Sequence, residues 1–549
     1  MRTPNSFAIA KVILLTWASV SAAQAKPEQI MVSMRDGIEL ATDLYLPTGN
    51  GPWPCILTRS PYSVNGNRSA AERFAKEGFA VAVQSCRGRF KSKGEYDPFK
   101  TDHHDGYDMV EWIAGQTWSN GKIGMLGGSA LGITTNLAAT QTPPHLVCGY
   151  VVVAPASARR NTVYMGGVYR KEMNDGWLTG MNAPFAIDET MQHPPASSHW
   201  DWREIPDFHS RIRIPICNVG GWFDIFAQGT IDNFVGLQAN GAGLAAGNQK
   251  LIMGPYAHGQ LGGRLKFPAG RRGLFGLDHQ LRWFNRWLKD LDNGIDREPP
   301  VRYYLMGDTE DPAAPGNEWK EASAWPPPAR PTSFFLHPQK TLATTAATAG
   351  SLSFSYDPKN PVSTVGGANL ISGGKGPMDQ RQIKERPDYL RFQTEILTAP
   401  IEVAGRVTVD LYVSSDAPDT DFVAKLVDVY PDGYEALLTD GIIRARYREG
   451  FDREVMMKPG EVVRVRVDLW STAIAFNKGH RVALHITSSN DPRFDPNPNT
   501  GHPQRADNET RVAKNTIHFS QRYPSRLLLP VGTGSKPPAS LAASQTKDE

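Results

Sequence analysis

The sequence has 549 residues, of which 40% are apolar and 21% are charged. These values are typical of a soluble globular protein, and the length allows a large core and more than one domain. The 59 basic and 56 acidic residues nearly balance, which argues against a nucleic acid or a membrane surface as the partner.

The first 25 residues have the pattern of a signal peptide. Positive charges at Arg2 and Lys11 precede the apolar run Val12–Ala22, and small residues follow at Ala23 and Ala25. The apolar run is too short to cross a bilayer as a helix, and no later stretch looks transmembrane. We therefore expect cleavage after Ala25 and a periplasmic or secreted mature protein. An uncleaved membrane anchor is the less favoured alternative.

Residues 26–325 are predicted to form an α/β domain with a mostly parallel sheet. After a predicted β-hairpin around Asp36-Gly37, short apolar runs alternate with segments of helical spacing, which is typical of strands covered by helices on both faces. The expected strands are Cys55–Pro61, Phe79–Cys86, Gly149–Pro155, Ile214–Gly221 and Lys250–Pro255, and the expected helices are Arg68–Gly78, His104–Gln116 and Asp278–Gly294.

Residues 159–213 interrupt this alternation. The segment is rich in Trp, Met, His and Pro, and we expect a helical cap inserted over the sheet. Its carboxylates are candidates for holding a substrate amine, and no pattern distinguishes among Asp175, Asp201, Glu204 and Asp207. Before the cap, Arg87-Gly88-Arg89 is expected to form an ion-paired loop, with substrate binding as the less favoured role.

Residues 326–533 are predicted to form a second, all-β domain, a β-sandwich or a jelly roll of the galactose-binding-like kind. Apolar residues alternate with polar ones in Val407–Val413, Val463–Leu469 and Val482–Ile486, as in antiparallel strands with one buried face. The last residues, 534–549, are rich in Ser, Ala and Lys and are expected to be a disordered tail.

The four cysteines do not indicate a metal site or a disulfide. Cys55, Cys148 and Cys217 lie in apolar runs, where a free cysteine behaves as a small hydrophobic residue, and no pair can be assigned from the sequence with the remaining Cys86. Neither a C-x-x-C nor an H-E-x-x-H pattern occurs. We expect mostly reduced core cysteines and no metal or organic cofactor.

The strongest local motif surrounds Ser129. In Gly127-Gly128-Ser129-Ala130-Leu131-Gly132, a serine flanked by small residues stands between a predicted strand and a predicted helix. A sharp turn of this kind exposes the hydroxyl above the strand end and directs the N–H of Ala130 at a developing oxyanion. A turn without a chemical role is the alternative for this motif alone.

A serine nucleophile needs a base and an orienting carboxylate, which follow in the order Ser, acid, His in α/β hydrolases. Asp224 comes just after the predicted strand Ile214–Gly221, and His258 just after Lys250–Pro255. Both therefore belong to the edge of the sheet where strands end and ligands collect. The other histidines, among them His103, follow no clean buried strand and are weaker candidates.

The chain resembles the family of cocaine esterases, α-amino-acid ester hydrolases and Xaa-Pro dipeptidyl-peptidases from about Glu28 to Val531. The stretches that carry the resemblance are MRDGIELATDLYLP, ILTRSPY, SCRGRFKSKGEY, DGYDMVEWIAGQTWSNGKIGMLGGS, NVGGWFDIF, GPYAHG and LWSTAIAFNKGHRVALHITSSNDPRFDPNPNTG. The resemblance implies an α/β-hydrolase core, a helical cap and a C-terminal jelly roll.

The resemblance also implies residue roles. Ser129 matches the nucleophile, Asp224 the acid and His258 the base, and Tyr62 matches the tyrosine that donates to the oxyanion beside the N–H of Ala130. The position of Tyr62, after the predicted strand Cys55–Pro61, agrees with this role. The family usually has tyrosine directly after the nucleophile, where this sequence has Ala130, so the N–H donor is retained but an aromatic side chain is missing.

The sequence thus predicts a secreted serine hydrolase of small-molecule esters or amides that works through an acyl-enzyme. An Xaa-Pro dipeptidyl-peptidase is the alternative within the same chemistry. A non-catalytic carbohydrate- or ligand-binding protein on an inactive hydrolase core is the alternative from another class. The natural substrate and a possible homo-oligomer stay open.

Overall fold

A computed structural model describes residues 27–268 and 276–534 of the protein. The predicted signal peptide, residues 1–25, lies outside the described residues, as does the predicted tail from residue 535 onward. Within the described ranges, no helix is both long and apolar enough to cross a membrane.

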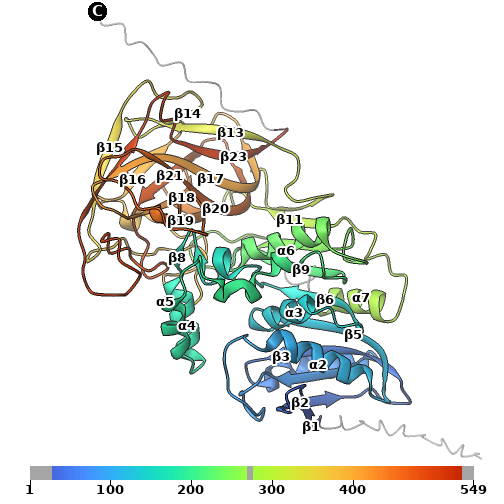
Figure 1. Ribbon diagram of the computed structural model, residues 1–549. Coiled ribbons are helices and arrows are strands. Elements are labelled where there is room, and N and C mark those ends of the chain that lie inside the picture. The colour runs from blue at the N-terminus through green and yellow to red at the C-terminus, as the bar shows by residue number, and fades with distance from the viewer. Residues whose placement is uncertain (1–26, 269–275, 535–549) are drawn as a thin grey trace, which may run out of the picture.

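The N-terminal domain is built on a ten-stranded sheet with the order β1-β2-β4-β3-β5-β6-β9-β10-β11-β12 (Figure 1). Neighbours from β4 to β11 in this order are parallel, and β1, β2 and β12 add antiparallel edges. The strands are β1 Glu28–Ser33, β2 Glu39–Tyr45, β3 Trp53–Ser60, β4 Ala80–Ser85, β5 Ser119–Gly128, β6 Leu146–Val152, β9 Ile216–Phe223, β10 Lys250–Ala257, β11 Val301–Leu305 and β12 Glu318–Ala322. The predicted hairpin and all five predicted core strands are therefore present.

Helices cover both faces of this sheet. Residues of α2 and α3 belong to one buried apolar cluster, and residues of α1 and α7 to another on the opposite face. The helices are α1 Arg68–Lys76, α2 Asp102–Ala114, α3 Ala130–Thr140, α6 Ala227–Asn240 and α7 Leu277–Leu288. The predicted end of the last helix at Gly294 is wrong, because Asp290 has a φ of 56° and a right-handed helix cannot continue through that conformation.

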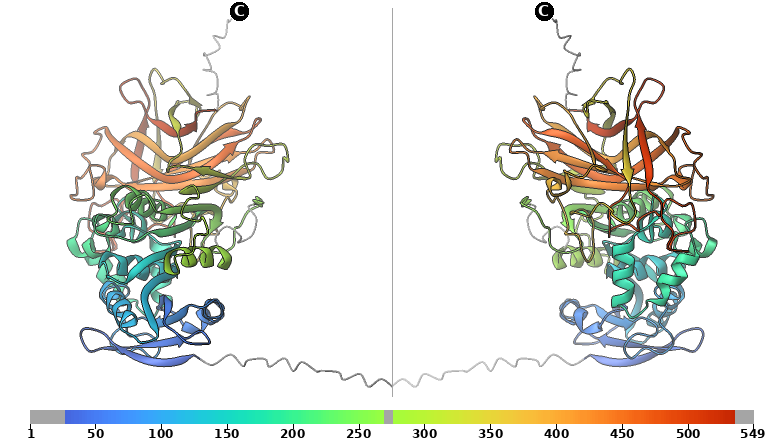
Figure 2. Two further views of the ribbon diagram at one scale, coloured as in Figure 1. Left: turned by 90° about the vertical axis from the view of Figure 1, so that its right-hand side faces the viewer. Right: turned by 90° about the vertical axis from the view of Figure 1, so that its left-hand side faces the viewer.

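The cap is partly helical. It contains α4 Lys171–Gly180 and α5 Phe185–Gln192, which lie beside the junction of the two domains (Figures 1 and 2). Short helical turns, η2 Ala158–Thr162, η3 Ser198–Arg203 and η4 Ile205–Phe208, complete it. The two-stranded hairpin of β7 Tyr164–Met165 and β8 Val168–Tyr169 was not predicted, because its four residues are too few to show a period of two.

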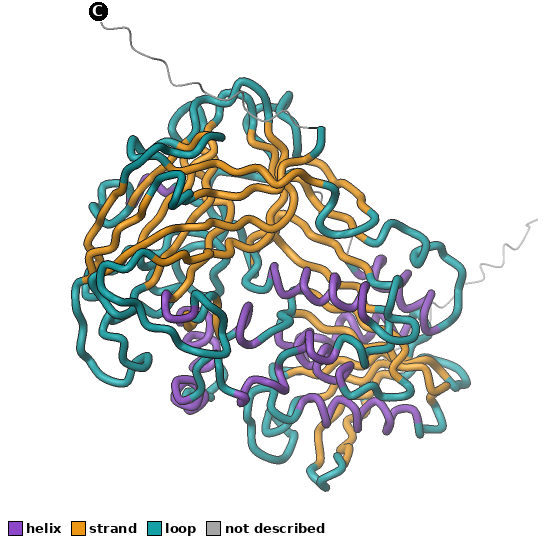
Figure 3. The backbone as a smooth tube through the Cα atoms, turned by 45° about the horizontal axis from the view of Figure 1, so that its top comes forward, coloured by secondary structure: helices purple, strands orange, loops and turns teal. Residues whose placement is uncertain are grey.

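The regular elements of the C-terminal domain are almost all strands, which form two packed sheets joined by long loops (Figure 3). The side chains of Val407, Val409, Leu411 and Val413 are all fully buried between them, as the alternation predicts. One sheet contains β13 Ala329–Leu336, β14 Leu342–Ala343, β15 Ser351–Tyr356, β17 Ile401–Ser415, β20 Val463–Phe476, β22 Ala513–His518 and β23 Arg526–Gly532; the other contains β16 Leu390–Gln393, β18 Asp421–Val429, β19 Glu435–Arg444 and β21 Arg481–Thr487.

The two domains share main-chain hydrogen bonds and a continuous apolar core. Met306 donates its N–H to the carbonyl of Ala473 at 3.0 Å and accepts from the N–H of Ala475 at 2.8 Å. Buried Trp222 of β9 belongs to the same apolar cluster as the jelly-roll strands and packs against Trp325 with ring centroids 5.4 Å apart. These contacts fix the jelly roll relative to the sheet edge that carries the candidate site.

All four cysteines are buried and free. Burial raises the pKa of Cys217 to about 12, so its thiol stays protonated and unreactive at neutral pH. The prediction of reduced core cysteines is confirmed.

Candidate active site

Ser129 occupies a strained turn between β5 and α3. Its φ of 56° and ψ of −122° are rare for a residue with a side chain and indicate a conformation that the surrounding fold imposes. The turn is held by the Ser129 N–H, which donates to the carbonyl of Val152 at 2.9 Å. The hydroxyl consequently projects from the end of the strand.

Two positions around this turn require glycine, because neighbouring atoms lie too close to leave room for a side chain. A Cβ at Gly127 would lie 2.0 Å from the carbonyl oxygen of Leu131, and a Cβ at Gly132 would lie 2.9 Å from the Cβ of Ala154. The second glycine therefore stands three positions after the serine because that turn of α3 packs against the chain beyond β6. This contact explains the departure from the G-x-S-x-G spacing.

Asp224 and His258 meet Ser129 at the same sheet edge. The His258 Nε2 lies 2.9 Å from the Ser129 Oγ, and its Nδ1 lies 2.8 Å from the Asp224 Oδ2. Asp224 is fully buried, and its Oδ1 accepts the N–H of Phe226 at 2.7 Å. Because one carboxylate oxygen is held by the main chain, the other is fixed in place to orient the imidazole.

Tyr62 and Ala130, the two residues expected to donate to the oxyanion, lie just after β3 and at the start of α3. Ala130 is the first residue of α3, so its N–H has no acceptor within the helix. The Tyr62 oxygen accepts the indole N–H of Trp177 at 2.8 Å, and since this N–H can only donate, the phenol proton is free for another acceptor. Burial raises the pKa of Tyr62, which keeps that proton bound at neutral pH.

A pocket with roughly 830 Å³ of empty space opens over Ser129. Its lining is mainly apolar and aromatic, and includes Phe99, Trp177, Trp202 and Phe226. Phe99 and Trp177 stack with ring centroids 5.3 Å apart. The cap and the loop after β9 therefore supply aromatic walls, although Ala130 itself supplies none.

The jelly roll also contributes to this pocket through Leu370. The carboxylate of Glu172 in α4 accepts the N–H of Leu370 at 3.1 Å and of Ser372 at 2.6 Å, and it is also hydrogen-bonded to Ile371. These partly buried hydrogen bonds hold the loop around Leu370 against the cap. Sequence analysis missed them, because the donors are main-chain N–H groups about 200 residues further along the chain.

None of the four cap carboxylates considered for amine binding lines the pocket. Asp175 pairs with Arg505 at 3.0 Å, Asp201 pairs with Arg159 at 2.5 Å, and Glu204 caps the turn by accepting the N–H of Arg159 at 3.0 Å. Asp175, Asp201 and Glu204 therefore have structural roles. The acidic residues that do line the pocket are Asp97 and Glu189, which no motif distinguished.

The two arginines of the Arg87–Arg89 loop have different partners. Arg87 pairs with Asp36 and with Asp105, each at 2.7 Å, as expected for an ion-paired loop. Arg89 donates to the carbonyl of Pro61 at 2.8 Å and to that of Met181 at 2.9 Å. Arg89 thereby fixes the main chain next to Tyr62 against the cap.

Two family models match this chain. The X-Pro dipeptidyl-peptidase (S15 family) model matches residues 36–186 and 179–260, and the X-Pro dipeptidyl-peptidase C-terminal non-catalytic domain model matches residues 293–528. The chain is 32% identical to cocaine esterase from Rhodococcus sp., over 91% of this chain and 98% of that protein. It is 25% identical to a putative serine esterase from Mycobacterium bovis, over 84% of this chain and 90% of that protein.

Solved structures show the same fold. An aminopeptidase from a marine sediment Thaumarchaeota archaeon has a TM-score of 0.79 at 23% identity, covering 97% of this chain and 99% of that chain. An α-amino acid ester hydrolase has a TM-score of 0.77 at 24% identity, covering 96% of this chain and 100% of that chain. These solved structures show the fold, and the 32% identity to cocaine esterase over 91% of the chain shows that the protein belongs to the cocaine esterase family and is a serine hydrolase of ester or amide bonds.

Proposed function

We propose that Ser129, His258 and Asp224 form the catalytic triad of this hydrolase. The observation that supports it is the continuous hydrogen-bond chain from Ser129 through His258 to buried Asp224, at 2.9 and 2.8 Å. His258 takes the hydroxyl proton as Ser129 attacks the substrate carbonyl, and then delivers it to the leaving group. Water activated by the same imidazole hydrolyses the acyl-enzyme.

Tyr62 and the N–H of Ala130 stabilise the oxyanion in this proposal. The phenol is oriented by the N–H of Trp177, and the Ala130 N–H stands at the N-terminus of α3, where the helix dipole favours negative charge. Each donor that meets the oxyanion contributes about 3 kcal/mol to the stabilisation of the transition state.

The pocket favours a neutral substrate with an apolar or aromatic acyl group. Its two acidic residues share one lysine, since the Lys100 Nζ lies 2.7 Å from the Asp97 carboxylate and 3.7 Å from the Glu189 carboxylate. A free substrate amine, which an X-Pro dipeptidyl-peptidase must hold, would have to displace this lysine. The aromatic walls instead offer contact area for a flat, uncharged group.

A substrate panel tests this proposal. We expect p-nitrophenyl esters of aromatic and medium-chain acids to have higher kcat/KM than ampicillin-like amides, and much higher than Xaa-Pro anilides. The measurement is initial rates over the whole panel with one enzyme preparation. Faster release from Xaa-Pro anilides would overturn the proposed substrate class and favour the peptidase; no turnover of any compound would favour the non-catalytic binding protein.

Export is part of the proposed function. The pattern of charge, apolar run and small residues in residues 1–25 supports cleavage after Ala25 and a periplasmic or released enzyme. Expression of the full chain in a bacterium, followed by fractionation and N-terminal mass spectrometry, is expected to find a product that begins at Lys26 outside the cytoplasm. A product in the membrane fraction that retains its first residues would contradict this expectation.

A further inference from the structure

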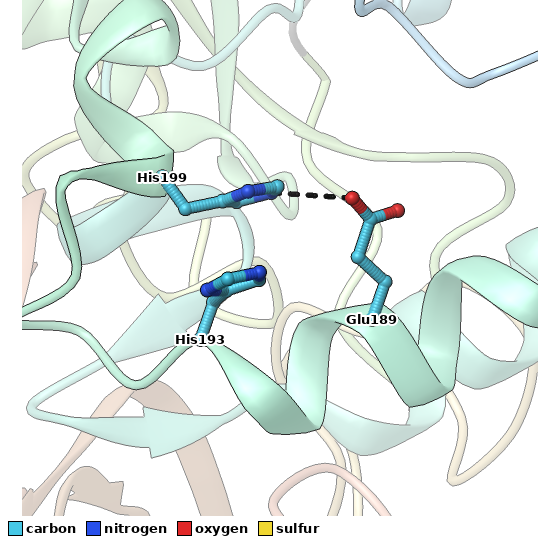
Figure 4. A group of neighbouring side chains, drawn as sticks. All are labelled: Glu189, His193 and His199. Carbon is cyan, nitrogen blue, oxygen red and sulfur yellow. Dashed lines mark ion pairs between the residues drawn. The ribbon is translucent and has the colours of Figure 1, made fainter.

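Three potential ligands gather in the cap, apart from the proposed triad. Glu189, His193 and His199, here called the cap cluster, offer a carboxylate oxygen and two ring nitrogens that all lie within 4.8 Å of one another (Figure 4). The two imidazole rings are stacked with centroids 4.0 Å apart and an angle of 4° between planes. The His199 Nε2 lies 4.0 Å from the Glu189 Oε1.

The local chain explains why these side chains converge. Glu189 is in the last turn of α5, and His193 is its C-cap residue four positions on, so both lie on one side of the helix. After the two prolines that follow, the Ser197 hydroxyl lies 3.3 Å from the His193 Nδ1 and accepts the N–H of His199 at 3.2 Å. The serine therefore holds the imidazole of His193 and the main chain of His199, and it leaves the His193 Nε2 available.

We propose that the cap cluster is a binding site for Zn²⁺ or a similar borderline divalent transition metal. Two imidazole nitrogens and one carboxylate oxygen are a donor set that Zn²⁺ accepts, and three protein ligands leave one position for water. With bonds of about 2.0–2.1 Å, ligand atoms around a tetrahedral ion lie roughly 3.4 Å apart. Side-chain rotations that bring the present atoms about 1 Å closer complete the site.

The neighbouring cation does not occupy the site. Lys100 is 3.7 Å from Glu189 but 2.7 Å from Asp97, so Asp97 is its closer partner and remains so when Glu189 turns toward the imidazoles. All three ligands lie within eleven residues of chain, so that little loop entropy is lost on binding. The sequence pattern, E-x-x-x-H-x-x-x-x-x-H, is neither of the zinc motifs sought in the sequence.

An ion in the cap cluster would fix one wall of the pocket. Glu189 and His199 line the same pocket as Ser129, and they come from α5 and from η3, which the ion would join. The binding site contains no member of the proposed triad. Metal binding can therefore be tested whether or not the proposed catalytic roles are correct.

Calorimetric titration of the purified full chain with Zn²⁺ tests the proposal. We expect a micromolar or tighter site that His193→Gln, His199→Gln and Glu189→Gln each weaken at least about tenfold. His502→Gln is the matched control, because His502, Asp507 and Glu509 form the other group of three potential metal ligands among the described residues, and all three are exposed. The control is expected to retain the site.

A second measurement needs no variant and covers the case in which a substitution disturbs the cap. Diethyl pyrocarbonate modifies accessible histidines, and bound Zn²⁺ is expected to protect His193 and His199 in peptide mass spectrometry. The proposal is overturned if the unmodified chain takes up no Zn²⁺ at micromolar concentration, if the site persists in the His193 and His199 variants, or if Zn²⁺ leaves the modification of both histidines unchanged.

Discussion

Replacing Ser129 by alanine is expected to lower kcat roughly 10⁶-fold, since the nucleophile of a serine hydrolase acts together with its base and neither works alone. The change removes one oxygen atom and adds no bulk, so the strained turn at φ 56° is kept. The measurement is hydrolysis of the best ester of the panel, together with labelling of intact protein by a fluorophosphonate probe.

The jelly roll provides a matched control for this serine. The Ser414 Oγ lies 2.9 Å from the His518 Nε2, the same separation as in the proposed triad, but the described structure places no carboxylate against that imidazole. We expect Ser414→Ala to retain both activity and labelling. A Ser129→Ala protein that still reacts with the probe, or that keeps more than a hundredth of the activity, would exclude Ser129 as the nucleophile.

Replacing Tyr62 by phenylalanine is expected to reduce kcat by about 10²- to 10³-fold with little change in KM, because a donor to the oxyanion acts mainly in the transition state. The ring stays in place, so loss of the hydroxyl alone is measured. Steady-state kinetics on the same ester give the two constants separately. Probe labelling of Ser129 is expected to continue, although more slowly.

Tyr96 is the control for Tyr62. It is a neighbouring tyrosine whose hydroxyl has no hydrogen-bond partner among the described residues, and Tyr96→Phe is expected to leave kcat unchanged. Trp177→Phe removes the N–H that orients the Tyr62 oxygen and is expected to cost less than loss of the phenol itself. If Tyr62→Phe matched the unmodified enzyme, the oxyanion would have to be stabilised by other donors.

Much of the architecture could be predicted because it depends on local pattern. Continuous apolar runs such as Cys55–Pro61 that alternate with helical segments are typical of a parallel sheet covered on both faces, and the alternation in Val407–Val413 indicates one buried face. The end of α7 could not be predicted. No residue before Gly294 is a helix stop by type, and the left-handed conformation of Asp290 depends on its surroundings.

The burial of charged side chains could not be predicted from the sequence either. Arg59 lies within the predicted strand Cys55–Pro61, and in the structure its side chain is fully buried and pairs with Asp102 at 2.7 Å. Glu172 likewise resembles any helical glutamate until the loop at Leu370 reaches it. Such partners are separated by tens to hundreds of residues, and neither partner carries a local mark of the other.

The amino-acid sequence by itself determined the α/β core, the jelly roll and the proposed residues Ser129, Asp224 and His258, because strand ends in a parallel sheet meet at one edge and each residue directly follows such an end. Only the tertiary structure decided the distances among them, the aromatic pocket and the cap cluster. The distances and the pocket arise where segments distant in the chain pack together, and long-range packing leaves no periodic trace in the sequence. The cap cluster is local, but its spacing matches neither zinc motif sought in the sequence.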